Sequence, residues 1–220
     1  MSFDVKKTTE EIIQWIRDWF EVNGKGCNAV IGMSGGVDSS AAAWLTREAG
    51  YECMGATMRL YDNEILAAEP GTCCSLDDVE DARSVAHRLG MPFYVFNFSQ
   101  DFREKVMDAF VDAYEKGLTP NPCIECNRHL KFERFLHRAQ ELDCQYIVTG
   151  HYARIRQDEE TGRYLLYKAA DRAKDQTYFL ACLTQEQLAH AAFPLGGLTK
   201  EQARAIAEEQ GFINARKRDS

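Results

Sequence analysis

One glycine-rich turn constrains the fold of this 220-residue chain more than any other feature. The turn, GMSGGVDSS at residues 32–40, follows the apolar run 29–31 and precedes the apolar run 41–45. This order predicts a strand, a turn and a helix. Two adjacent glycines, Gly35 and Gly36, let the backbone approach a bulky anion without Cβ clashes. Peptide N–H groups at a helix start attract such an anion, so the pattern predicts a phosphate site.

The turn differs from the two commonest phosphate loops. No Gly-Lys-Ser/Thr follows it, as a Walker A loop requires, and the Gly-x-Gly-x-x-Gly spacing of dinucleotide folds is missing. The serines of the turn, Ser34, Ser39 and Ser40, supply hydroxyl donors. Asp38 could hold a metal ion that neutralises phosphate charge. The run SGGVDSS resembles the pyrophosphate loop of the ATP pyrophosphatase superfamily, whose members split ATP between its α- and β-phosphates. The alternative is a turn that only joins a strand to a helix.

Composition and the N-terminus restrict the location of the protein. Hydrophobic residues make up 45% and charged residues 27% of the chain, which is ordinary for a globular protein. No apolar run approaches the roughly 18 residues needed to span a bilayer. The first residues lead into an amphipathic segment rather than a signal peptide. We therefore expect a cytoplasmic protein with no membrane partner.

The charge distribution is uneven along the chain. A net charge of −8 argues against a general nucleic-acid binder, and no DNA partner is expected. The acidic excess lies in residues 1–120, whereas residues 121–174 carry slightly more basic than acidic side chains. This second section leaves room for an RNA partner. A solvated surface of mixed charge is the alternative.

Strand and helix patterns alternate along the chain and predict an α/β fold, a Rossmann-like parallel sheet flanked by helices. Ligands of such sheets lie beyond the carboxyl ends of the strands, where the glycine turn, Met58 and Gly150 would converge. The neighbouring His151 could carry a proton or contact phosphate, or be satisfied structurally. Strands are expected at 28–33, 53–60, 93–96 and 146–149, a hairpin at 154–167, a loop at 117–127, and helices at 8–24, 37–50, 75–90, 100–116, 130–142, 177–182, 185–192 and 200–210.

A second motif, TPNPCIECNR at residues 119–128, carries two of the eight cysteines. Two prolines stiffen this loop, which places Cys123 and Cys126 at a helix start. The helix dipole and nearby basic side chains favour the thiolate, which is the form that attacks carbon or sulfur. Without an export signal the cysteines should be mostly reduced, and Cys53 and Cys144 are expected to be small buried hydrophobes.

Four separated segments make the resemblance specific. The segments TPNPCIECNRHLKF, TGHYAR, KDQTYFL and CCSLDDVEDAR, together with the glycine turn, closely resemble the bacterial tRNA-specific 2-thiouridylases. The resemblance runs from about residue 29 to the end of the chain. It implies that ATP, with Mg²⁺, is bound by Gly32, Met33, Ser34, Gly35, Gly36, Val37, Asp38 and Ser39, with Met58 and Gly150 contacting the nucleotide.

The resemblance also implies a reaction and its partners. Enzymes of this family adenylate the C2 oxygen of the wobble uridine in certain tRNAs. A sulfur delivered as a persulfide by a donor protein then displaces AMP and leaves 2-thiouridine. Cys126 corresponds to the catalytic cysteine of the family, which is a nucleophile. Asp38 is the second residue expected to be catalytic. The residues implied to contact RNA are Asn121, Pro122 and Cys123 at the target base and Lys174, Asp175 and Gln176 elsewhere on the tRNA.

The chain departs from the family pattern near its end. The second cysteine of the family, which carries the persulfide, lies in a motif of the form Lys-Asp-Ser-x-x-Ile-Cys-Phe, and this chain stops at its threshold, Lys217–Ser220. We expect the chain to bind ATP without completing persulfide transfer. The expected division is an N-terminal amphipathic helix (1–27), a pyrophosphate-loop domain (28–152), and an extension of hairpin and helices (153–220) that begins a truncated tRNA-binding region.

Two alternatives remain open from the sequence. Residues 3–28 look more like the lead helix of ammonia-dependent NAD synthetases, which use the same loop to adenylate a carboxylate, although NPCIECN and GHYAR have no role there. Alternatively, Cys123 and Cys126 ligate an iron–sulfur cluster, or zinc together with Cys73 and Cys74. A redox disulfide between Cys123 and Cys126 is a further version of the second alternative.

Overall fold

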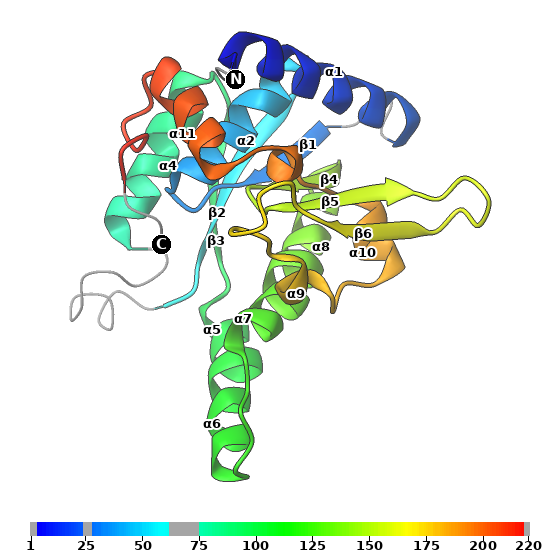
Figure 1. Ribbon diagram of the computed structural model, residues 1–220. Coiled ribbons are helices and arrows are strands. Elements are labelled where there is room, and N and C mark those ends of the chain that lie inside the picture. Colours follow the sequence, from blue (N-terminus) through cyan, green and yellow to red (C-terminus); the bar gives the residue numbers. More distant parts are fainter. Residues whose placement is uncertain (1–3, 24–27, 62–74, 218–220) are drawn as a thin grey trace.

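The computed structural model describes residues 4–23, 28–61 and 75–217. Figure 1 shows a central sheet between helices, with a two-stranded hairpin beside it and a helical arm that projects away from it. All neighbouring strands of the central sheet are parallel, in the order β3-β2-β1-β4-β7. The strands are β1 (Asn28–Gly32), β2 (Cys53–Arg59), β3 (Phe93–Asn97), β4 (Cys144–Thr149) and β7 (Ala191–Ala192).

Helices cover both faces of the sheet, so its central strands are apolar on both sides. In β1, Ala29 and Ile31 point into one core, whereas Val30 points into the other. The helices of the first core are α1 (Val5–Asn23), α2 (Val37–Glu48), α4 (Leu76–Arg88) and α11 (Lys200–Glu209). The second core holds η2 (Cys126–Arg134), a π-helical segment, together with α8 (Phe135–Gln140), α9 (Thr177–Leu180) and α10 (Gln185–Ala189).

The helical arm, residues 99–118, extends from the second face (Figure 1). It exposes a row of apolar side chains, and Pro122 begins the short helix that returns the chain to the body. The exposed side chains are Met107, Val111, Tyr114 and Leu118. The arm contains α5 (Ser99–Phe102), η1 (Arg103–Met107) and α6 (Asp108–Glu115), and it is followed by α7 (Pro122–Glu125).

Most of the predicted elements are confirmed. Ser75 caps α4 as expected: its hydroxyl accepts from the Asp78 N–H at 3.2 Å, and Asp78 accepts from the Ser75 N–H at 3.1 Å. The hairpin is present as β5 (Ala153–Gln157) and β6 (Tyr164–Lys168). Cys53 and Cys144 are buried, and burial raises the pKa of Cys53 to about 12. No helix in the described part of the chain is long and apolar enough to cross a membrane.

Three predicted boundaries are wrong. Helix α1 begins before Thr8, since Asp4 accepts from the Lys7 N–H at 3.1 Å and caps an earlier start. Residues 191–192 do not continue α10 but form β7, which pairs with β4. The expected loop 117–127 ends at Pro122, where a proline suits the first position of a helix. The two cysteines of that motif are therefore helical.

The strand order reverses between β1 and β4, which makes their carboxyl ends the natural ligand site of this sheet. Gly32 at the end of β1 lies opposite Thr149 at the end of β4. Later segments pack around the same sheet, since β7 pairs with β4 and α11 packs against α2. The short η3 (Pro194–Gly197) connects these two segments.

Candidate functional site

The glycine turn forms a phosphate loop that connects β1 with α2. Gly36 is the N-cap residue of α2, with φ −87° and ψ 162°, and no side chain caps the helix there. The hydroxyl of Ser39 accepts from the Ser34 N–H at 3.2 Å and donates to the Gly36 carbonyl at 3.0 Å. The loop is therefore braced from within. Peptide N–H groups at an uncapped helix start are the groups that bind phosphate.

The two adjacent glycines of the loop, Gly35 and Gly36, are needed for different physical reasons. Gly35 has φ +75°, and a Cβ there would lie 2.7 Å from the Asp78 Cα, so α4 forms a wall against it. At Gly36 a Cβ would meet only the Ser34 hydroxyl, at 3.5 Å. Gly35 is thus required by the protein, whereas Gly36 leaves open space where a ligand could approach. The sequence argument assigned the second role to both.

Asp38, in the first turn of α2, is held by two partners from distant parts of the chain. The ammonium group of Lys200 donates to both carboxylate oxygens, at 2.8 and 2.7 Å, and the Tyr152 hydroxyl donates to one of them at 2.8 Å. The Lys200 side chain is 14% exposed and that of Asp38 is 31% exposed. A lysine therefore already balances the negative charge of Asp38 beside the phosphate loop.

The other residues predicted to contact the nucleotide differ in how far they are buried. Met33 and Val37 are 2% and 3% exposed and pack in the first core, so only their backbone faces the loop. Met58, near the end of β2, is half-buried against the second core. A Cβ at Gly150 would lie 2.8 Å from the Ser39 nitrogen, so this glycine lets the chain after β4 pass the first turn of α2. Gly150 therefore borders the phosphate loop directly.

His151 is packed as a structural residue. Its Nδ1 lies 2.7 Å from the Thr149 hydroxyl, and its ring contacts Phe132 and Phe193 with centroid separations of 5.7 and 5.8 Å. Burial, with a smaller contribution from Lys131, lowers the pKa of His151 well below 6.5. The imidazole is neutral near pH 7. These contacts favour the structural alternative over a proton carrier.

The cysteine helix, α7 with the beginning of η2, presents its two thiols differently. Asn121 caps it by accepting from the Cys123 N–H at 3.0 Å, and Pro122 is the first helical residue. Cys123 is exposed, whereas Cys126 is 9% exposed and belongs to the second core. Cys126 also begins the π-helical segment η2. Such widened turns occur frequently at functional sites.

A third thiol lies beside the cysteine helix, and the sequence argument missed it. The Sγ atom of Cys182 lies 3.7 Å from the Ile124 carbonyl and 3.6 Å from the Phe179 carbonyl. Burial raises the pKa of Cys182. The amide of Asn127 donates to the same Phe179 carbonyl at 3.3 Å. Helix α9 and the residues that follow it thus form one wall of the cysteine region.

The predicted RNA stretch, residues 174–176, connects the two parts of the site. Gln176 accepts from the Tyr152 N–H at 2.9 Å, and Tyr152 in turn donates to Asp38. Asp175 accepts from Ala169 at 2.7 Å and from Thr177; burial opposes its ionisation, but these hydrogen bonds prevail and lower its pKa. The side chain of Lys174 is half-buried.

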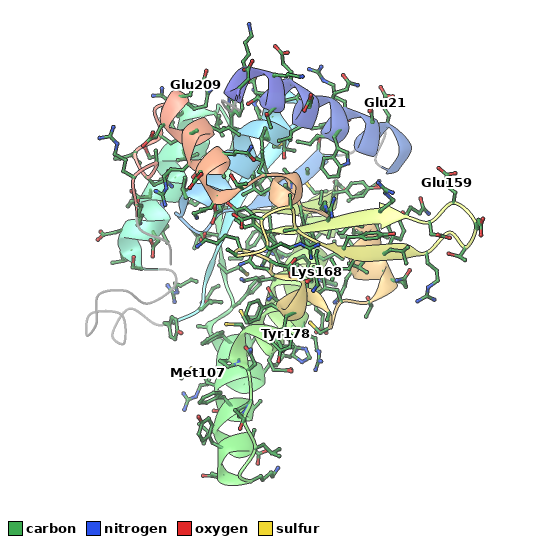
Figure 2. All side chains as sticks on the ribbon, viewed as in Figure 1. Glu21, Met107, Glu159, Lys168, Tyr178 and Glu209 are labelled. Carbon is green, nitrogen blue, oxygen red and sulfur yellow. The ribbon has the colours of Figure 1, made fainter. Side chains whose placement is uncertain are left out.

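The stretch leads into α9, which packs against α7 and η2. Figure 2 labels Tyr178 of α9 where the arm joins the body, and Met107 farther along the arm. A chain of contacts therefore runs from the phosphate loop through residues 152 and 176 to the cysteine helix. The helical segments η2 and α8 lead into the parallel strand β4, so they run antiparallel to the strands of the sheet. The start of η2 therefore lies at the edge of the sheet where the strands have their carboxyl ends. The phosphate loop lies at the same edge.

Sequence reasoning missed the residues that brace the phosphate loop: Tyr152, Lys200, Asn214 and Lys217. Each is far from the loop in sequence, and only the fold brings it there. The signal that could have indicated Lys200 is its position at the first turn of a helix, after the capping box of Thr199 and Gln202. Basic side chains are unfavourable at a helix N-terminus unless an anionic partner is near.

The described residues contain no group of three or more His, Cys, Asp or Glu that could hold a metal ion. The cysteine helix supplies two thiols, Cys123 and Cys126, so a cluster there would need a further ligand. Cys73 and Cys74, considered above as zinc ligands, lie outside the described residues. A Mg²⁺ ion bound with a phosphate chain requires only one or two carboxylates. Asp38 is a carboxylate of the first turn of α2, and both of its oxygens accept from Lys200 in this structure.

Comparison with known proteins agrees with this geometry. The family described as tRNA methyl transferase HUP domain matches residues 27–220. The chain is 53% identical over 191 residues to a tRNA-specific 2-thiouridylase MnmA of Clostridioides difficile, covering 87% of this chain and 53% of that protein. It is 54% identical to the protein of the same name from Symbiobacterium thermophilum, covering 87% of this chain and 50% of the relative. The chain thus spans about half the length of these relatives.

Solved structures agree on the fold. An NH3-dependent NAD synthetase from Campylobacter jejuni covers 100% of this chain and 80% of its own, with TM-score 0.59 and 17% identity. The U34-tRNA thiolase NcsA from Methanococcus maripaludis, solved with its [4Fe-4S] cluster, covers 93% of this chain and 64% of its own, with TM-score 0.57 and 15% identity. With its parallel sheet, its phosphate loop and a match over residues 27–220, the chain belongs to the tRNA methyl transferase HUP domain family.

Proposed function

We propose that this chain is the ATP-binding part of a tRNA-specific 2-thiouridylase. The observation that carries the proposal is the uncapped helix start at Gly36, with open space above it, at the strand-order reversal of the sheet. The phosphate chain of ATP lies along residues 32–39, with Met58 and Gly150 beside the nucleotide. The relatives bearing this function are about half identical to the chain over most of its length.

The proposed first step is the adenylation of the wobble uridine. The C2 oxygen of the base attacks the α-phosphorus of ATP, the bond to the β-phosphate breaks, and pyrophosphate leaves. Peptide N–H groups of the phosphate loop stabilise the charge that develops on the leaving group. Asp38 would hold Mg²⁺, which neutralises phosphate charge when bound. Lys200 pairs with Asp38 at 2.7 Å in this structure.

The proposed second step places sulfur on the activated base. AMP is a good leaving group, so the terminal sulfur of a donor persulfide (R–S–S⁻) can attack C2 and displace it, which gives an R–S–S–C2 intermediate. The Cys126 thiolate then attacks the sulfur bound to R, the S–S bond breaks, and the products are 2-thiouridine and a disulfide between Cys126 and R. Asn121, Pro122 and Cys123 contact the extruded base. Lys174, Asp175 and Gln176 contact the tRNA. If an iron–sulfur cluster takes part, Cys123 and Cys126 are the residues that would hold it.

The location and domain organisation follow from this proposal. An enzyme acting on tRNA belongs in the cytoplasm of a bacterial cell. The unit that binds ATP comprises residues 28–152, preceded by the N-terminal helix. The extension 153–220 begins the tRNA-binding region, and its hairpin and helix α9 are the parts of the chain expected to meet RNA.

The test is nucleoside mass spectrometry of tRNA. Unmodified tRNA is incubated with ATP, Mg²⁺ and a persulfide-carrying donor protein, together with this chain or a version extended past Ser220 with the remainder of a relative. We expect 2-thiouridine with the extended version and ATP binding with both. Deamido-NAD with ammonia serves as the control substrate. Formation of NAD without any thiolated nucleoside would show that the chain is an amide ligase instead.

A further inference from the structure

The last described segment, residues 212–217, runs behind the phosphate loop and is here named the strap. Ile213 is 71% exposed, whereas Asn214 and Ala215 are 2% and 5% exposed. Arg204 of α11 donates to the Ala215 and Lys217 carbonyls at 2.8 and 3.0 Å. The strap is therefore fixed along its length.

The far end of the strap is anchored to α4. The Lys217 ammonium group donates to Asp78 and to Asp81, each at 2.6 Å. Burial opposes this pairing, but the hydrogen bonds prevail, so the pKa of Asp78 is lowered and that of Lys217 is raised. Asp78 is also the residue whose backbone lies against Gly35. The strap and the wall of the loop thus form one unit.

Asn214 is the contact between the strap and the loop. Its amide nitrogen donates to the Gly35 carbonyl and to the Ser40 hydroxyl, each at 2.9 Å. The Ser40 hydroxyl donates to the Gly36 carbonyl at 3.1 Å. Asn214 therefore fixes the Gly35 carbonyl directly and supports the Gly36 carbonyl through Ser40, and the Ser39 hydroxyl also donates to the Gly36 carbonyl at 3.0 Å.

Fixing these carbonyls also fixes the opposite side of each peptide. In a trans peptide the C=O and the following N–H point in opposite directions. The Gly35 carbonyl shares its peptide with the Gly36 N–H, and the Gly36 carbonyl shares its peptide with the Val37 N–H. Held from behind by Asn214, both N–H groups are directed away from the strap, toward the open side of the uncapped helix start.

Only one end of the Asn214 amide is satisfied by hydrogen bonds. Its Oδ1 atom is buried and has no hydrogen-bond partner among the described residues. Leaving such an acceptor unpaired costs about 1–3 kcal/mol. If the amide were flipped, Oδ1 would face the Gly35 carbonyl, and two acceptor oxygens repel each other. The hydrogen bonds that Nδ2 donates therefore determine the orientation of the amide. A buried polar group with this imbalance requires an explanation.

We propose that Asn214 is a positioning residue for the pyrophosphate part of the nucleotide. It does not touch the ligand but aims the Gly36 and Val37 N–H groups at it. This inference rests on the proposed function, because it assumes that the loop binds a phosphate chain. It adds that the strap, through Lys217, Asp78 and Asp81, couples the loop to α4.

Isothermal titration calorimetry with two probes tests the proposal. The probes are inorganic pyrophosphate, which only the loop should hold, and AMP, which lacks the β- and γ-phosphates. For Asn214→Ala we expect the Kd of pyrophosphate to rise about tenfold and that of AMP to change less than twofold. Asn214→Thr keeps one hydroxyl donor and should fall between the wild type and the alanine variant.

The matched control is Thr46→Val, which removes one buried hydrogen bond in α2, from the Thr46 hydroxyl to the Ala42 carbonyl at 2.8 Å, away from the loop. It should lower the melting temperature without changing either Kd. Equal weakening of both probes in Asn214→Ala, or an unchanged Kd of pyrophosphate, would overturn the positioning role. If Asn214→Ala does not fold, the same criteria apply to Asn214→Thr. A wild-type chain that binds neither probe would instead overturn the proposed function.

Discussion

The phosphate loop and the cysteine helix lie at the same edge of one sheet but are built in opposite ways. The loop is braced by Gly35 against α4, by Gly150 against α2 and by Asn214 behind the backbone, and it stays open at Gly36. The cysteine helix exposes Cys123 to solvent and is continuous with a projecting arm of exposed apolar side chains. A preformed loop suits a small ligand of fixed shape. An exposed helix suits macromolecules that arrive and leave.

The comparison teaches that the two halves of the proposed reaction make different demands. Pyrophosphate has the same geometry in every turnover, so rigidity of the loop lowers the cost of binding it. The target base and the sulfur donor must each reach the cysteine helix, so that region has to remain accessible. Changes in the loop should therefore affect binding of nucleotide, whereas changes in the helix should affect the RNA product.

The largest expected effect is a loss of pyrophosphate release after a substitution beside the phosphate loop. Asp38→Ala removes the carboxylate proposed to hold Mg²⁺ and leaves the Lys200 ammonium group without that partner, so pyrophosphate release from ATP should fall by at least about a hundredfold. A coupled pyrophosphate assay measures it. Asp77→Ala, an exposed first-turn carboxylate of α4, is the control. Unchanged nucleotide affinity and turnover in Asp38→Ala would contradict the site assignment.

The next effect concerns the two thiols, and it is measured in the version extended past Ser220. Cys126→Ser should eliminate 2-thiouridine because a serine hydroxyl is a far weaker nucleophile than a thiolate. Cys123→Ser should only reduce the yield, and neither change should alter the affinity for ATP. Nucleoside mass spectrometry measures the yield of 2-thiouridine, and calorimetry in parallel measures the affinity for ATP. Normal thiolation by the Cys126 variant would place the nucleophile elsewhere.

A smaller effect separates the roles of the adjacent glycines. Gly35→Ala puts a side chain at φ +75° and within 2.7 Å of the Asp78 Cα, so it should lose more than the roughly 1–2 kcal/mol that a left-handed residue costs. Gly36→Ala should fold with nearly wild-type stability but bind pyrophosphate at least several-fold more weakly, because its Cβ occupies the ligand side.

The control for this pair is Gly50→Ala, at φ +95° with no atom within 4 Å of the added Cβ. It isolates the backbone strain from the contact with α4. Thermal unfolding and pyrophosphate titration are measured on all three variants. If Gly36→Ala binds pyrophosphate as the wild type does, the open side of the loop is not the ligand side.

The smallest effect is a pH dependence from His151, whose ring packs against Phe132 and Phe193. Burial holds the pKa of His151 well below 6.5, so below that pH the unfolded chain binds a proton that the folded chain does not. The free energy of unfolding should therefore fall as the pH drops below 6.5, by up to about 1.4 kcal/mol per unit. His151→Gln should flatten that slope in chemical denaturation at pH 5 to 8.

The exposed His137 provides the control, since its side chain is 65% exposed. His137→Gln is measured over the same pH range, because it removes an exposed imidazole instead of the packed one. An identical slope in the wild type and in His151→Gln would mean that the imbalance in proton binding arises at another group.

The sequence predicted those parts of the molecule whose causes are local. The strand, turn and helix around Gly36 follow from glycine chemistry and apolar patterning, and the capping box of Ser75 is a signal of four residues. The cysteine motif was recognised, but its helix start was placed too late, because Pro122 was interpreted as a loop residue rather than as a first helical residue.

What the sequence did not predict depends on tertiary contacts. Lys200 and Asn214 lie 162 and 179 residues from their partners Asp38 and Gly35, and no local pattern joins them. The burial of Cys126 depends on the packing of η2 against the sheet rather than on its own motif. Strand β7 has only two residues, too few for a period-two pattern to indicate a strand.

The unequal exposure of the cysteine pair has a practical consequence. Among the cysteines in the described part of the chain, Cys123 is the exposed one, whereas Cys126 three residues away is covered. A maleimide added to the native protein will therefore meet Cys123 first and leave its neighbour unmodified. A fluorophore or spin probe attached there would lie about one helical turn from Cys126 and report on the solvent side of this helix.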